Sequence, residues 1–236
     1  MAKRRPAGRR QRRAAGGSQW LYVTGAAVAL GLVAAVIMVG TASRDDSDGA
    51  DDPIVVPTSR PSAVDTNGMI YGNPDASVTV VEYLDFQCPV CLRANQNVLH
   101  EIEQKYVETG QAKLEVKPIA ILGDESVAAT EGAQCASAQG RFWPYHDILF
   151  ANQGAENDGG FSDSRLKEMA TKVGLIASTF NNCLDSDTYE SRVKADTDAA
   201  NDQGVRGTPT IFVDGTRVET SVDAISSAIE AALSGG

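Results

Sequence analysis

Residues 78–91 of this 236-residue chain read VTVVEYLDFQCPVC and join a β-branched apolar run to a Cys-x-x-Cys pair. The run is typical of a buried strand, and the residues after it predict a helix that begins at the first cysteine. Pro89 takes the first helical position, where its missing N–H costs no hydrogen bond. Unpaired N–H groups at the helix N-terminus favour a thiolate at Cys88, which is therefore the expected nucleophile. Cys91, one turn later, is the expected resolving thiol.

A second motif, Gly207-Thr208-Pro209-Thr210, precedes the apolar residues 211–213. It matters because the Cys-x-x-Cys spacing alone is also half of a zinc site. A proline that opens a strand is a natural place for a cis X-Pro bond. If this motif lies beside the Cys88–Cys91 pair, a cis Pro209 would present the backbone of Thr208 to an extended substrate chain, which can pair with it. The alternative is a proline in trans at the strand edge.

Together, the strand–CPVC–helix and the distant GTPT–strand resemble the thioredoxin superfamily. The long helical segment between them is similar to that of the DsbA-like thiol:disulfide oxidoreductases. The resemblance implies an α/β, thioredoxin-like domain at residues 67–236, with an inserted helical subdomain at about 124–203. The Pro89-Val90 dipeptide departs from the strongly oxidising members, which often have histidine there.

The N-terminal part predicts a membrane anchor. The net charge is −10, yet every charged side chain among residues 1–13 is basic. Residues 20–40 follow without a charge and, as a helix, would span about 30 Å, the thickness of the hydrocarbon core of a bilayer. We interpret 1–19 as a cytoplasmic head rather than a nucleic-acid-binding arm, and 20–40 as one transmembrane helix. A cleaved signal peptide is the alternative. Residues 41–66, rich in Asp, Pro and Ser, predict a disordered acidic linker.

The remaining elements follow from periodicity and from turn residues. We expect a short edge strand at 69–72, the strand Val78–Leu84, a helix that ends before Gly110, and a strand at 113–122. Helices are expected at 142–152, 162–173 and 178–184, followed by one that begins at Asp187 and is capped with the help of Glu190. A type I′ hairpin is expected at 210–218, and Ser221 should cap the last helix.

Two further cysteines, Cys135 and Cys183, lie in different expected helices of the insertion. Four cysteines form an even set, as is usual in an oxidising compartment. We expect these two to form a structural disulfide; the alternative is a pair of buried free thiols.

Glu82 interrupts the apolar run six positions before Cys88. A buried carboxylate must be paired or protonated. Lys117 in the next expected strand is a candidate partner, and the resemblance implies an acid and a lysine beneath the disulfide. We interpret Glu82 as a proton acceptor for Cys91; the alternative is an acid at the strand edge that faces solvent.

The sequence therefore predicts a membrane-tethered, extracytoplasmic enzyme that donates the Cys88–Cys91 disulfide to exported proteins through a mixed disulfide. No cofactor, metal or nucleic-acid fingerprint is visible. The resemblance implies reoxidation by a quinone-linked membrane partner of the DsbB or vitamin-K-epoxide-reductase type. Three alternatives stay open. The first is a reductase or isomerase that uses the same site, and the second is a copper(I)-delivery module that binds the metal through Cys88 and Cys91. The third is a thioredoxin-like binding domain whose cysteines are structural.

Overall fold

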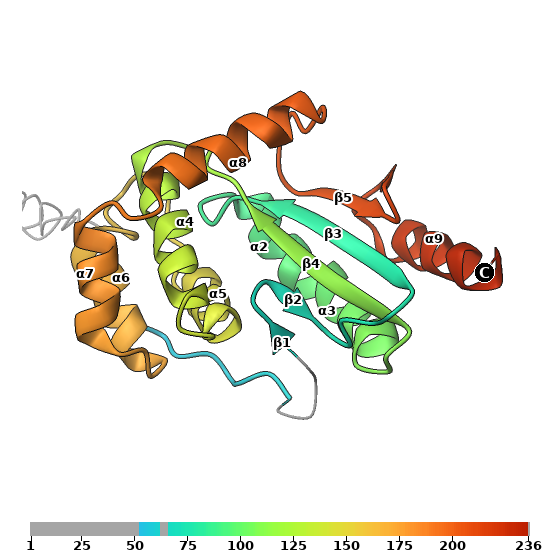
Figure 1. Ribbon diagram of the computed structural model, residues 1–236, viewed down its shortest axis with the longest axis horizontal. Coiled ribbons are helices and arrows are strands. Elements are labelled where there is room, and N and C mark those ends of the chain that lie inside the picture. Colours follow the sequence, from blue (N-terminus) through green and yellow to red (C-terminus); the bar gives the residue numbers. More distant parts are fainter. Residues whose placement is uncertain (1–51, 62–65, 236) are drawn as a thin grey trace, which may run out of the picture. The chain divides into compact units, whose positions relative to one another are not determined.

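The computed structural model describes residues 52–61 and 66–235, and the strands among them form one mixed sheet. The strand order is β1-β2-β4-β3-β5-β6. β3 and β4 pair in parallel and lie at the centre of the sheet (Figure 1), whereas β2 and β5 flank them as antiparallel neighbours. The bounds are β1 Thr66–Asn67, β2 Ile70–Tyr71, β3 Val78–Leu84, β4 Ala112–Pro118, β5 Thr210–Val213 and β6 Thr216–Val218.

The helix between β3 and β4 begins at the Cys-x-x-Cys motif, as predicted. It is one continuous run of α2 Pro89–Ala94, the π-helical η2 Asn95–Leu99, α3 His100–Ile102 and the π-helical η3 Glu103–Val107. The chain leaves it through Gly110, whose φ of 77° is readily adopted by glycine. The two π-helical segments were not predicted, because the apolar spacing of a helix does not register a locally wider turn.

β4 ends at Pro118, four residues earlier than expected. The N–H groups of Ile121 and Leu122 donate to the Asp85 carboxylate instead of to a strand. The apolar pattern at 113–122 therefore continues past the end of the strand.

The alternation of side chains along β3 decides which residues meet the Cys-x-x-Cys helix. Val80 and Leu84 point to the face covered by that helix and by α9 Val222–Gly235, and Glu82 shares this face because side chains alternate along a strand. Val81 and Tyr83 point to the opposite face, where they pack with residues of α8 Glu190–Asp202 and the segment after it.

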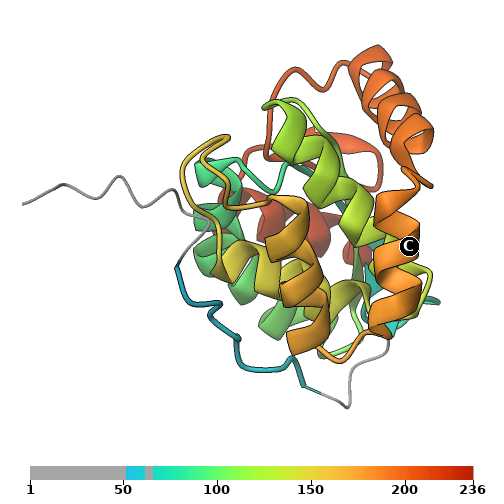
Figure 2. The same ribbon diagram turned by 90° about the vertical axis from the view of Figure 1, so that its left-hand side faces the viewer.

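Five helices are inserted between β4 and β5, and the first four of them gather beside the sheet (Figures 1 and 2). They are α4 Asp124–Ser137, α5 Phe142–Ala151, α6 Asp163–Lys172, α7 Ala177–Asp185 and α8 Glu190–Asp202. The expected bounds of α5, α6 and α7 agree to within one residue at each end. The predicted start of α8 at Asp187 is wrong: Asp187 has a φ of 47° in the preceding turn, and no side chain caps the helix.

The C-terminal elements form as predicted. β5 and β6 are joined by Asp214-Gly215, whose φ angles of 46° and 80° are those of a type I′ turn. The Ser221 hydroxyl accepts a hydrogen bond from the N–H of Ala224 at 3.3 Å and so caps α9.

Residues 52–61 differ from the disordered linker expected at 41–66, because they lie against the domain. The N–H of Val55 donates to Oδ1 of Asn152 at 2.7 Å, and Nδ2 of Asn152 donates to the carbonyl of Val55, also at 2.7 Å. Arg60 forms ion pairs with Glu103 and Asp147. Polar composition predicted disorder, but a few long-range contacts order this segment, which we call the strap (residues 52–61, cyan in Figure 1).

No helix within residues 52–61 and 66–235 is long and apolar enough to cross a membrane. The predicted head at 1–19, the transmembrane helix at 20–40 and residues 41–51 of the linker lie outside the described residues, so these assignments stay predictions.

Candidate active site

The two cysteines of the motif occupy different positions at the start of α2. Cys88 is the N-cap residue and Pro89 follows at the first helical position. Both thiols are free; Cys88 is 6% exposed, whereas Cys91 is fully buried. Cys88 is therefore the thiol that a second protein can reach.

The environments of these two thiols move their pKa values in opposite directions. A hydrogen bond from the Cys91 thiol, aided by Thr208 and by the backbone N–H groups of Val90 and Cys91, lowers the pKa of Cys88 to about 5. Burial, with smaller contributions from Cys88 and the charge of Glu82, raises the pKa of Cys91 well above its usual range. At neutral pH the pair is thus a thiolate at Cys88 and a thiol at Cys91.

The second motif lies beside Cys88. The Thr208-Pro209 bond is cis, and Sγ of Cys88 is 3.3 Å from the carbonyl oxygen of Thr208. The hydroxyl of Thr210 donates to the carbonyl of Gly207 at 2.8 Å and closes the turn before β5. The fold thus brings together two motifs that are 120 residues apart in the chain.

Glu82 lies beneath the cysteines and is fully buried. None of the described residues donates a hydrogen bond to either of its carboxyl oxygens. Burial, followed by the negative charges of Glu103 and Cys88, raises the pKa of Glu82 to about 8. The carboxyl group is therefore protonated at neutral pH and can exchange its proton close to that pH.

Lys117 is not the partner of Glu82. Glu82 is in register with Val116, and Lys117, one position later, points to the opposite face of the sheet. There its ammonium group lies 3.5 Å from the Glu115 carboxylate and 5.8 Å from the centre of the Tyr83 ring. The expected Glu82–Lys117 pair does not form, because neighbouring residues of a strand face opposite sides of the sheet.

Asp85 is a buried residue of this site that sequence analysis missed. Its Oδ1 accepts hydrogen bonds from the N–H of Gln87 and the hydroxyl of Ser126, at 2.8 and 2.7 Å. Its Oδ2 accepts from the N–H groups of Ile121 and Leu122, at 2.8 and 3.2 Å. Asp85 therefore fixes the loop before Cys88 against the start of α4. The feature of the sequence that could have identified Asp85 is a carboxylate at the end of an apolar strand.

Two glutamine side chains also hold the loop before Cys88 against the helical insertion. The side chain of Gln87 donates to Ser126 at 3.0 Å and accepts from the N–H of Asn157 at 2.6 Å. Nε2 of Gln153 donates to the carbonyls of Phe86 and Cys88, at 2.5 and 3.2 Å. The helical insertion thus holds the backbone on which Cys88 is mounted.

The other two cysteines form a bond in the insertion. Cys135 of α4 and Cys183 of α7 form a disulfide with a Cα–Cα distance of 6.0 Å, the pairing expected for a structural cross-link. Among the described residues, no group of three or more His, Cys, Asp or Glu side chains is arranged to hold a metal ion.

The chain is similar to known protein-disulfide oxidoreductases in sequence and in structure. The family model described as Thioredoxin matches residues 65–231. A protein of Rickettsia felis named as a protein-disulfide oxidoreductase is 29% identical over 197 residues, which is 81% of this chain and 69% of that protein. Disulfide bond formation protein D of Bacillus cereus is 26% identical over 219 residues, 87% of this chain and 96% of that protein. The crystal structure of oxidised BdbD from Bacillus subtilis matches with a TM-score of 0.67 and 26% identity, over 71% of this chain and 94% of that one.

Proposed function

Because this chain belongs to the thioredoxin family and is a DsbA-like protein disulfide oxidoreductase, we propose that it donates a Cys88–Cys91 disulfide to exported proteins. The observation that carries this proposal is the difference between the two thiols. Reduction leaves Cys88 as a thiolate that its surroundings stabilise, with its pKa lowered to about 5. A disulfide whose reduced form is stabilised in this way is a strong oxidant.

The reaction proceeds through a mixed disulfide. A substrate thiolate attacks Sγ of Cys88, the Cys88–Cys91 bond breaks, and Cys91 leaves as a thiolate that takes up a proton. A second substrate thiolate attacks the substrate sulfur bonded to Cys88, and Cys88 leaves as a thiolate. Two electrons pass from the substrate to the enzyme, and the substrate gains a disulfide.

Glu82 exchanges a proton with Cys91 in this scheme. Its protonated carboxyl group gives a proton to the departing Cys91 thiolate, and its carboxylate takes one back when Cys91 attacks during reoxidation. The backbone of Thr208 pairs with an extended segment of the substrate beside Cys88.

Reoxidation needs an electron acceptor at the membrane. The acceptor is a quinone-linked membrane protein of the DsbB or vitamin-K-epoxide-reductase type. Residues 20–40 anchor the chain, with residues 1–19 in the cytoplasm and the domain outside it. Full-length protein in membrane fractions should resist carbonate extraction and be cleaved by protease added from outside; a mature N-terminus close to Ser43 would support a cleaved signal peptide instead.

The redox potential tests the direction of the reaction. Equilibration of the full-length chain with glutathione buffers should give a potential closer to the roughly −120 mV of a strong oxidase than to the roughly −270 mV of thioredoxin. A value near the lower figure would reject disulfide donation and favour a reductase.

A further inference from the structure

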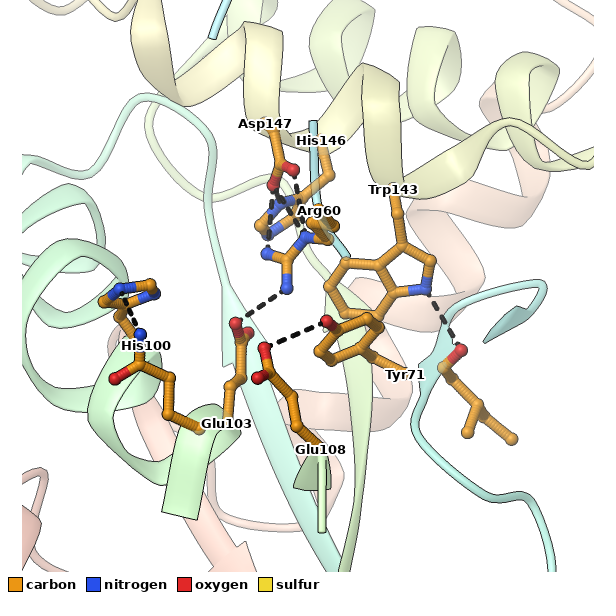
Figure 3. Close-up of polar contacts among 10 residues, drawn as sticks. Arg60, Tyr71, His100, Glu103, Glu108, Trp143, His146 and Asp147 are labelled. Carbon is orange, nitrogen blue, oxygen red and sulfur yellow. Dashed lines mark hydrogen bonds and ion pairs between the residues drawn. The ribbon is translucent and has the colours of Figure 1, made fainter. Parts of the chain in front are cut away.

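A buried charge cluster forms where Glu103 of η3 and Asp147 of α5 meet the strap, which supplies the cation Arg60 (Figure 3). The guanidinium of Arg60 donates to Oε2 of Glu103 at 2.7 Å and binds both carboxylate oxygens of Asp147, the closest at 2.9 Å. Its central carbon lies 4.7 Å from the ring centre of Tyr71 and 4.5 Å from that of Trp143. Ion pairs and aromatic faces together fix this side chain in one position.

The charges of the cluster do not cancel. Arg60 keeps its charge, because Glu103 and Asp147 raise its pKa despite the opposing effect of burial. Burial lowers the pKa of His146, which is therefore neutral while its Nδ1 lies 2.9 Å from Asp147. Burial raises the pKa of Glu103, and Arg60 acts against that rise. When Glu103 and Asp147 are both ionised, the cluster carries one net negative charge. Glu108, which accepts from the Tyr71 hydroxyl at 3.3 Å, is exposed and screened by solvent.

Glu103 connects this cluster to Glu82. It belongs to η3, the last part of the helix that starts at Cys88, and it is 5% exposed. One of its oxygens binds Arg60, while Oε1, like both oxygens of Glu82, is buried and receives no hydrogen bond from the described residues. The groups that act on the Glu82 carboxyl are Glu103 from η3, Arg60 from the strap, and Cys88 with Cys91 from the start of the same helix.

We propose that Arg60 and Glu103 form a positioning pair that decides when Glu82 gains and loses its proton. The strap is then part of the redox machinery and more than a tether. This inference rests on the proposed role of Glu82 as the proton partner of Cys91. Arg60 supplies the positive charge for which sequence analysis had chosen Lys117, but it reaches Glu82 through Glu103 rather than by direct contact.

The pair acts on the protonation of Glu82 through the charge that it places beside this carboxyl group. Burial is the largest cause of the raised pKa of Glu82, and the negative charge of ionised Glu103 raises it further. Arg60 favours the ionised form of Glu103 and so opposes the effect of burial, because a buried carboxylate without a partner takes up a proton more readily. Losing either member of the pair therefore changes the number of protons held beneath the cysteines.

The test is an infrared titration of the full-length reduced chain, in which protonated carboxyl groups give a separate carbonyl band. The band that disappears in Glu82→Gln reports Glu82. In Glu103→Gln its titration midpoint should fall by about one pH unit, because a neutral amide replaces a negative neighbour while Arg60 stays. Glu230→Gln is the matched control, since Glu230 pairs with Lys105 at 3.3 Å on the surface, and it should leave the midpoint unchanged.

Arg60→Met should add a second carboxylic-acid band at pH 7, which the double variant with Glu103→Gln should lose. Arg60→Lys keeps the charge and should show no second band. If Arg60→Met does not fold, the Glu82 titration midpoint in Glu103→Gln is the test, and Arg60→Lys serves as the folded comparison. An unchanged Glu82 midpoint in Glu103→Gln, or no added band in folded Arg60→Met, would overturn the inference. A shifted midpoint with an unchanged pH profile of thiol exchange would support the pair and reject the proton role of Glu82.

Discussion

Reduction of the Cys88–Cys91 disulfide should change the stability of the domain in a pH-dependent way. The thiolate of Cys88 exists only in the reduced form, where its pKa is lowered from 9.0 to about 5. The folded reduced chain therefore binds fewer protons at neutral pH than the unfolded chain does. By linkage, this difference stabilises the reduced fold by at most about 2.7 kcal/mol at pH 7, and by about 1–2 kcal/mol once solvent screening is allowed for.

The sign and the pH range follow from the direction of the shift. Because the folded pKa is the lower one, the gain is complete above the unfolded value and disappears as the pH falls through about 5. The oxidised form gains instead from its cross-link, about 2 kcal/mol for a four-residue ring, and this term does not depend on pH. Glu82 is present in both forms, so its own contribution largely cancels.

The assay is urea unfolding of both forms from pH 4 to pH 8, with the Cys135–Cys183 bond left intact. The stability of the reduced form relative to the oxidised form should rise by about 1–2 kcal/mol between pH 4 and pH 7. Cys88→Ser can form neither the thiolate nor the disulfide, so the stability of the reduced parent chain relative to this variant should rise by the same amount between pH 4 and pH 7. A difference that stays constant across this range would refute the argument, whatever its sign.

Three further outcomes are expected. Cys91→Ala should accumulate mixed disulfides with exported proteins and Cys88→Ala should trap none, as seen on non-reducing gels; trapping through Cys91 would reverse their roles. Asp85→Asn should destabilise the domain by roughly 2–3 kcal/mol in urea unfolding, since it turns an amide toward N–H donors, whereas Asp75→Asn at an exposed site should change little. Glu82→Gln should slow exchange yet stabilise the fold by roughly 2–3 kcal/mol at pH 7, because the raised pKa of Glu82 makes stability fall as the pH rises from about 4.5 to about 8. Equal unfolding curves for Glu82→Gln and the parent chain at pH 7 and pH 9 would contradict that sign.

The sequence alone determined the elements that local chemistry controls. Pro89 placed the start of α2 because only the first turn of a helix tolerates a residue without an N–H. Asp214-Gly215 placed the β5–β6 hairpin because the turn needs two positive φ angles. Both ends of the strand Val78–Leu84 were predicted correctly, since a β-branched run in a central strand has few competing conformations.

Tertiary structure decided the electrostatics of the site. Glu82 and Lys117 looked like partners along the chain, but the parallel register of β3 and β4 sends them to opposite faces. The cation that acts on the Glu82 carboxyl is Arg60, which lies 43 residues from Glu103 and 87 from Asp147 in the chain. The strap is ordered by contacts with Glu103, Asp147 and Asn152, which lie far from it in the chain. Local spacing cannot encode such contacts, because charge interactions depend on distance in space and on burial, both of which are set by the assembled fold.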